Sequence, residues 1–142
     1  MKIYLLSVSG RLYSTQRLFN EASRRGHYIR IIDHMRCSLF FDKGTPKIYF
    51  GNEDINDFAD AIIPRIGASF TEHGVAIVNQ FEKNGVFNIA SALGIIRSRN
   101  KLLTMQHLAK QNIPIPKTLY SKNKETLKSQ LDLLNSEKYI IK

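Results

Sequence analysis

The first third of the chain switches between the hydrophobic patterns of strands and of a helix. Residues 3–8 form a near-continuous apolar run, which is typical of a strand buried on both faces of a sheet. Ser14 is expected to cap a helix whose apolar face ends before Gly26, and residues 27–33 then alternate as a second strand. A strand, a helix and a strand in this order predict a right-handed crossover and therefore a parallel sheet.

The middle of the chain combines a hairpin with further core elements. Two short aromatic segments, 38–41 and 47–50, flank a turn-like sequence and predict an antiparallel hairpin. A third core strand is expected at 61–63, with Pro64 ending it. Beyond it, the pattern predicts a helix around 75–81 that closes at Gly85, a strand at 86–89 and a short helix capped by Ser91.

The last third of the chain has the pattern of a domain that has only begun. Asn100 is a candidate cap for a helix that starts at Lys101, and the prolines within 113–116 end this helix. We then expect a strand at 117–120, a polar helix at about 124–134 and a terminal strand at 138–142. Such a segment is too short to bury its own faces, so we expect an α/β domain at 1–97 and an incomplete second domain at 98–142.

Composition and charge narrow the class of protein. The hydrophobic content of 43% excludes global disorder, and no run approaches the ~20 apolar residues of a membrane span. The single cysteine, Cys37, favours a reducing, cytoplasmic compartment. The net charge is +9, and residues 98–142 hold two thirds of this excess, with 9 basic and 3 acidic side chains. This balance favours a polyanionic partner, unless acidic residues in a longer protein offset it.

The candidate chemistry lies in a few basic residues. Arg65 follows a core strand at the sheet edge where parallel sheets bind ligands, and is a candidate anion contact, although a solvated surface arginine explains the spacing equally well. Arg97, Arg99 and Lys101 adjoin a predicted helix start, which suits phosphate better than nucleic acid; a solvated linker is the alternative. The loop SVSGRLYST lacks the glycines of a phosphate-binding motif, so turn and cap chemistry explains its hydroxyls better.

No catalytic or metal-binding constellation is predicted. The histidines have neither metal-ligand spacing nor a partner set for nucleophilic catalysis, and Cys37 is expected to be a small buried apolar residue. The four histidines are His27, His34, His73 and His107.

Several motifs nevertheless resemble a known family. The segment IIRSRNKLLTMQHLAKQNIPIPKT resembles the start of an ATP-grasp domain, with a lysine one position into a helix, an LA-x-x-x-I-x-x-P turn and a strand. Upstream, DAIIPRIG, RLYSTQRL, RRGH and GVAIVNQFEKNG resemble one branch of that superfamily, the RimK-type glutamate ligases, which add glutamate to the carboxyl end of a ribosomal protein. The similarity runs along nearly the whole chain and is weakest at 37–57.

This resemblance implies a fold, a reaction and a nucleotide site. The implied fold is α/β: a Rossmann-like parallel-sheet pre-ATP-grasp domain at 1–97, then the truncated start of an α+β ATP-grasp lobe at 98–142. Family members activate a carboxylate as an acyl phosphate, which an amine displaces. ATP and Mg²⁺ are the implied cofactors, and glutamate and a ribosomal protein acceptor are the implied partners. Lys101 and Lys142 match lysines that reach the nucleotide phosphates.

The resemblance also sets what this chain alone is expected to do. The family's glycine-rich flap and acidic Mg²⁺ ligands have no match in the sequence, so we expect the chain to stop within the lobe and to be catalytically inactive by itself.

Two other classes of function stay open. One is a stand-alone module whose basic C-terminal segment binds RNA or an acidic ribosomal protein, in which case binding would weaken steeply with salt. The other is a structural unit that dimerises or orients a ligase, so a homo-oligomer is also left open. No membrane partner is expected.

Overall fold

The computed structural model describes residues 1–44, 46–56 and 58–141. The chain divides into two compact units, Met1–Lys101 and Leu102–Lys142, and each is described here by itself. Among the described residues, no helix has the length and apolar character needed to cross a bilayer.

A four-stranded parallel sheet organises the first unit, as the crossover pattern predicted. The strand order is β2-β1-β6-β7, and all three pairings are parallel. The central strand β1 is buried on both faces, and Tyr4, Leu5 and Leu6 have no exposed surface. The strands are β1 (Lys2–Ser7), β2 (Tyr28–Ile32), β6 (Ala61–Arg65) and β7 (Phe87–Asn88).

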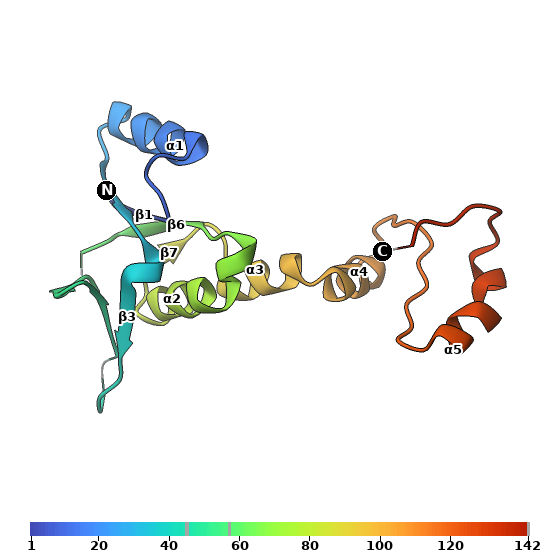
Figure 1. The fold of residues 1–142 in the computed structure, drawn as a ribbon. Coiled ribbons are helices and arrows are strands. Elements are labelled where there is room, and N and C mark those ends of the chain that lie inside the picture. The colour runs from blue at the N-terminus through green and yellow to red at the C-terminus, as the bar shows by residue number, and fades with distance from the viewer. Residues whose placement is uncertain (45, 57, 142) are drawn as a thin grey trace. The chain divides into compact units, whose positions relative to one another are not determined.

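Helices cover both faces of this sheet (Figure 1). On one face, α1 (Tyr13–Arg24) packs Leu18, Phe19 and Ala22 against a cluster that contains Leu5. On the other face, α2 (Thr71–Lys83) buries Ile77, Val78 and Phe81 in a larger cluster with Tyr4 and Leu6. Because side chains along a strand point to alternate faces, the single run of β1 supplies both clusters.

A small antiparallel sheet confirms the predicted hairpin and adds a strand to it. Its order is β3-β4-β5, and the buried side chains of Ile48 and Ile55 join it to the larger cluster. Arg30 on β2 donates two hydrogen bonds of 2.7 Å to the carboxylate of Glu53, so a bidentate ion pair links the two sheets. The strands are β3 (Cys37–Phe40), β4 (Lys47–Phe50) and β5 (Glu53–Asp54).

Two local predictions in the first unit are wrong. Pro64 lies within β6 and does not end it, because the ladder between β6 and β7 stops at Ile62 and Asn88. The missing N–H of Pro64 therefore breaks no pairing on that side. Ser14 is not the cap of α1: the helix begins one residue earlier, with Leu12 at the N-cap position.

The second unit differs more from its predicted elements. The helix at Lys101 forms as α4 (Lys101–Lys110), but the polar helix stops early as α5 (Lys124–Ser129), and a 3₁₀ turn follows at Leu131–Leu134. The strands expected at 117–120 and 138–142 are wrong for the described residues, because these segments form no ladder with another strand.

Candidate functional site

A groove of about 510 Å³ lies at the carboxyl edge of the parallel sheet. Parallel sheets bind ligands at this edge, because the loops that follow the strands meet there. Three parts of the first unit form the groove: the segment after β1, the end of β6 with the residues beyond it, and one face of helix α3 (Ala92–Arg99). The residues that line it are Val8, Leu12, Pro64, Arg65, Ile66, Gly67, Ala68, Ile95, Ser98 and Arg99.

Arg65 is the last residue of β6, opposite Ser7 at the end of β1. Its guanidinium Nη2 donates a hydrogen bond to the Ser14 hydroxyl in the first turn of α1, at 2.9 Å. This bond holds the arginine between the sheet edge and the start of the helix. The structure therefore places Arg65 at the carboxyl end of β6, where the strand pattern expected it, and its contact with an anion stays a prediction.

Arg99 reaches the same groove from helix α3. The Ser91 hydroxyl accepts a hydrogen bond from the Gly94 amide and caps this helix, as predicted. Ile95, Ser98 and Arg99 are spaced as one helical face, and all three line the groove. The Arg99 guanidinium donates a hydrogen bond to the backbone carbonyl of Ile66.

The other basic residues singled out in the sequence do not join this groove. Arg97 lies two positions from Arg99 on the same helix, which places it on a different face, and it is not among the lining residues. Lys101 is exposed at the first position of α4. Lys142 lies outside the described residues. The nucleotide contact of Lys101 and Lys142 thus stays a prediction.

The hydroxyls of the loop after β1 are used inside the loop. The Ser7 hydroxyl lies 2.9 Å from that of the buried Thr15 and donates to the Ser9 carbonyl at 3.2 Å. The Ser9 hydroxyl accepts a hydrogen bond from the Arg11 amide. These bonds are turn and cap chemistry, as the glycine-poor sequence indicated, and they are not arranged as a phosphate cradle.

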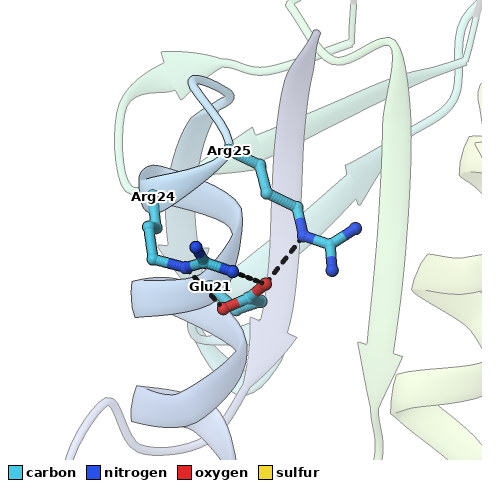
Figure 2. Close-up of polar contacts among 3 residues, drawn as sticks. All are labelled: Glu21, Arg24 and Arg25. Carbon is cyan, nitrogen blue, oxygen red and sulfur yellow. Dashed lines mark hydrogen bonds and ion pairs between the residues drawn. The ribbon is translucent and has the colours of Figure 1, made fainter.

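The arginines of the groove lack the carboxylate partner that the arginines at the end of α1 have. Figure 2 shows Arg24 and Arg25 bonded to Glu21 near the end of that helix. Hydrogen bonds from these arginines lower the pKa of Glu21 to about 2. In the groove, by contrast, Arg65 and Arg99 bond to a hydroxyl and a carbonyl, and no acidic residue is among those that line it. The groove thus holds two guanidinium charges that no lining carboxylate neutralises.

One buried histidine was assigned no role from the sequence. His34 has no exposed surface, and neither of its ring nitrogens has a hydrogen-bond partner in the described part of the chain. Burial lowers the pKa of His34, while the negative charge of Asp33 acts in the opposite direction. A lone histidine after a strand gives no sequence signal of this burial.

The described residues contain no group of three or more His, Cys, Asp and Glu side chains that could hold a metal ion. They therefore do not supply a set of ligands that fits Mg²⁺.

Solved structures share the fold of this chain. The chain superimposes on the macrocyclase MdnB from Microcystis aeruginosa MRC with a TM-score of 0.66 and 15% identity, covering 94% of this chain and 59% of that one. For the macrocyclase MdnC, solved with its precursor peptide MdnA, the TM-score is 0.67 with 17% identity, over 96% of this chain and 53% of that one. At these identities the similarity shows the fold alone.

Sequence comparison is more specific. A probable alpha-L-glutamate ligase of Aliivibrio fischeri (strain MJ11) is 42% identical over all 142 residues, and one of Vibrio cholerae serotype O1 (strain M66-2) is 40% identical. The chain covers 47% of each, so it spans about half the length of these relatives. Residues 1–95 match the family of the RimK PreATP-grasp domain. The chain therefore belongs to the RimK pre-ATP-grasp family and corresponds to the N-terminal portion of its glutamate-ligase relatives.

Proposed function

We propose that this chain is the N-terminal portion of an ATP-dependent carboxylate–amine ligase that adds glutamate to the carboxyl end of an acceptor protein. The observation that carries the proposal is the 42% identity over all 142 residues to a protein named a probable alpha-L-glutamate ligase. A ribosomal protein acceptor, which the family resemblance implies, and a cytoplasmic location, which the single cysteine favours, remain part of the proposal.

The geometry of the first unit supports a substrate-binding role in this reaction. Its groove lies at the carboxyl edge of a parallel sheet and presents two arginines whose hydrogen bonds, within the described part of the chain, go to a hydroxyl and a backbone carbonyl. Ligation of a carboxylate and an amine requires the acid to be held in one orientation while it is activated and attacked. Arginine suits this task because its planar fork of donors matches the two oxygens of a carboxylate.

The basic residues beyond the groove would serve the nucleotide. Lys101 is exposed at the start of α4, where a compact cation and the free amides of a helix start both favour phosphate. We propose that Lys101 and Lys142 contact the phosphates of ATP. ATP with Mg²⁺ would supply the phosphoryl group that activates the acid, and residues beyond those described here would hold the metal.

Turnover by the protein of the complete reading frame tests this proposal. The protein is incubated with ATP, Mg²⁺, glutamate and a peptide that ends in glutamate, and both ADP release and peptide mass are followed. We expect ADP release that depends on the peptide, together with mass increments of one glutamate residue. The 142-residue chain under the same conditions should release no ADP, because it spans about half the length of its relatives. ADP release without any change in peptide mass would contradict the proposal.

A basic binding module is the second candidate, favoured by the concentration of charge at residues 98–142, which hold 9 basic and 3 acidic side chains. Binding of RNA that weakens steeply between low and moderate salt would support it. Peptide ligation by the longer protein with no RNA binding would exclude it.

A further inference from the structure

We propose that the groove between Arg65 and Arg99 is a carboxylate site, which binds an acidic amino acid or the carboxyl end of a peptide. Only the choice of an acidic amino acid or a peptide carboxyl end as the ligand rests on the proposed function. The groove itself stands on geometry within the first unit.

Each of the two arginines is anchored by a hydrogen bond, Arg65 to a side-chain hydroxyl and Arg99 to a backbone carbonyl. Arg99 donates to the carbonyl of Ile66, the residue that directly follows Arg65, and Arg65 is itself bonded to Ser14. Each guanidinium carries five donor N–H groups, so each keeps donors for a ligand after making its anchoring bond. An arginine held in place by a neutral acceptor loses little further side-chain entropy when it binds an anion. The two charges are therefore positioned before any ligand arrives.

The start of helix α1 adds a third favourable contribution. Leu12 occupies the N-cap position and lines the groove, and its side chain has no polar atom to cap the helix. The amide groups and dipole of a helix start favour negative charge nearby. Because Leu12 and both arginines line one groove, an anion there would gain from the two charges and from the helix start beside them.

The walls of the groove favour an organic carboxylate over a nucleotide phosphate. Val8, Leu12, Pro64 and Ile95 contribute apolar surface, which suits the aliphatic part of an amino acid or peptide. The neighbouring loop is not arranged to bind phosphates, since the hydroxyls of Ser7 and Ser9 are engaged within it. A phosphate would also leave these apolar walls uncovered.

Nuclear magnetic resonance titration of the 142-residue chain tests the site without ATP. The probes are L-glutamate, a short peptide that ends in two glutamates, and inorganic phosphate. We expect saturable shifts at the amides of Gly67 and Ser98 with glutamate, with the peptide or with both, and which probe binds identifies the source of the carboxylate. Phosphate should bind more weakly than the better of the two. Absence of saturable shifts with both carboxylates, or tighter binding of phosphate, would overturn the proposal.

Charge-removing variants then assign the site to its arginines. Arg65→Gln and Arg99→Gln should each weaken carboxylate binding by about tenfold or more, because each removes a charge-assisted hydrogen bond. Arg65→Lys keeps the charge but loses the planar fork, so it should fall between wild type and Arg65→Gln. The matched control is Arg24→Gln, which removes the same charge from a helix end where Glu21 is the partner. Equal affinity in wild type, Arg65→Gln and Arg99→Gln would overturn the assignment.

The titration tests the carboxylate site and the turnover assay tests the proposed function, so either can be refuted without the other. Carboxylate binding without ligase turnover would uphold the site and refute the proposed function. Turnover by the longer protein without carboxylate binding at this groove would do the reverse.

Discussion

The guanidinium of Arg99 donates a hydrogen bond to the backbone carbonyl of Ile66, across a sequence separation of 33 residues. This bond fastens the last turn of α3 to the chain that leaves β6, and it brings a second arginine beside Arg65. The site is thus built where a helix end meets a strand end, and it needs no motif that is continuous in sequence.

Ile66 also limits what can stand at Gly74. A Cβ atom at Gly74 would lie 2.6 Å from Ile66 Cγ2 and 3.2 Å from His34 Cδ2. Helix α2 can therefore pack this close to Ile66 only because position 74 has no side chain. Gly74→Ala should lower the free energy of unfolding by about 1–3 kcal/mol through overpacking. Urea denaturation measures this change.

The control for this variant is Gly67→Ala, where φ is −72° and the nearest atom to an added Cβ is 3.5 Å away. It should change stability by no more than about 0.5 kcal/mol. Equal stability of Gly74→Ala and wild type would contradict the close packing of α2 against Ile66.

Burial of His34 predicts a loss of stability on mild acidification. Its pKa is lowered in the folded state, mainly by burial, so the unfolded chain takes up the proton first as the pH falls. The stability from the neutral ring is full above the unfolded pKa of about 6.5 and is lost as the pH falls toward the lower folded value. Asp33 raises the pKa of His34 and His73 lowers it. Denaturation midpoints between pH 8 and 5 check it.

His34→Leu removes the titrating ring and should flatten this part of the pH profile. A profile of the same slope in His34→Leu and in wild type would assign the pH dependence to another group.

Glu21 should stay ionised below the pH at which a glutamate carboxyl group ordinarily takes up its proton. Hydrogen bonds from Arg24 and Arg25 lower the pKa of its carboxyl group to about 2. In Arg24→Gln the pKa of Glu21 should rise toward the ordinary value, since the hydrogen bonds from Arg24 contribute most to lowering it. Added salt should also raise this pKa in wild type, because the ion pair is exposed. Carboxyl carbon shifts followed over pH report both changes. A wild-type pKa near 4.5 would show that the arrangement in Figure 2 does not persist in solution.

Lys101 and Lys142 should matter for nucleotide use in the longer protein. Lys101→Ala and Lys142→Ala are each expected to raise the KM for ATP or lower kcat by about 10- to 100-fold, because each removes a cation that would stabilise phosphate charge. Steady-state kinetics with varied ATP measure both constants. Lys110→Ala, at the far end of the helix that begins with Lys101, is the matched control and should turn over normally. Normal kinetics in both test variants would refute the phosphate-binding role.

The elements that could be predicted are those whose signal is local. The apolar run of β1 and the glycine that ends α1 predict the crossover, because these patterns depend only on neighbouring residues. Pro64 misled the prediction because its tolerance depends on where β7 stops, which is a tertiary fact. The strands expected beyond Lys101 failed for the same reason, since a strand forms only where another strand lies beside it.

In the candidate site, too, the features that could be predicted are those with a local sequence signal. Arg65 could be placed near the sheet edge because the core strand before it could be predicted, although β6 ends at Arg65 itself and not before Pro64. Arg97 and Arg99 are on different faces because their segment is helical, so of the two only Arg99 is among the residues that line the groove. The bond from Arg99 to Ile66 and the burial of His34 depend on packing between distant segments, for which the sequence carries no signal.

The most direct test of the account is mass spectrometry of an acidic peptide incubated with ATP, Mg²⁺, glutamate and the protein of the complete reading frame, as wild type and as Arg65→Gln. With the wild-type protein we expect the peptide mass to increase in steps of one glutamate residue. With Arg65→Gln we expect this increase to be far slower when the acidic peptide and glutamate are at limiting concentration. Peptide that keeps its mass with the wild-type protein would contradict the ligase assignment.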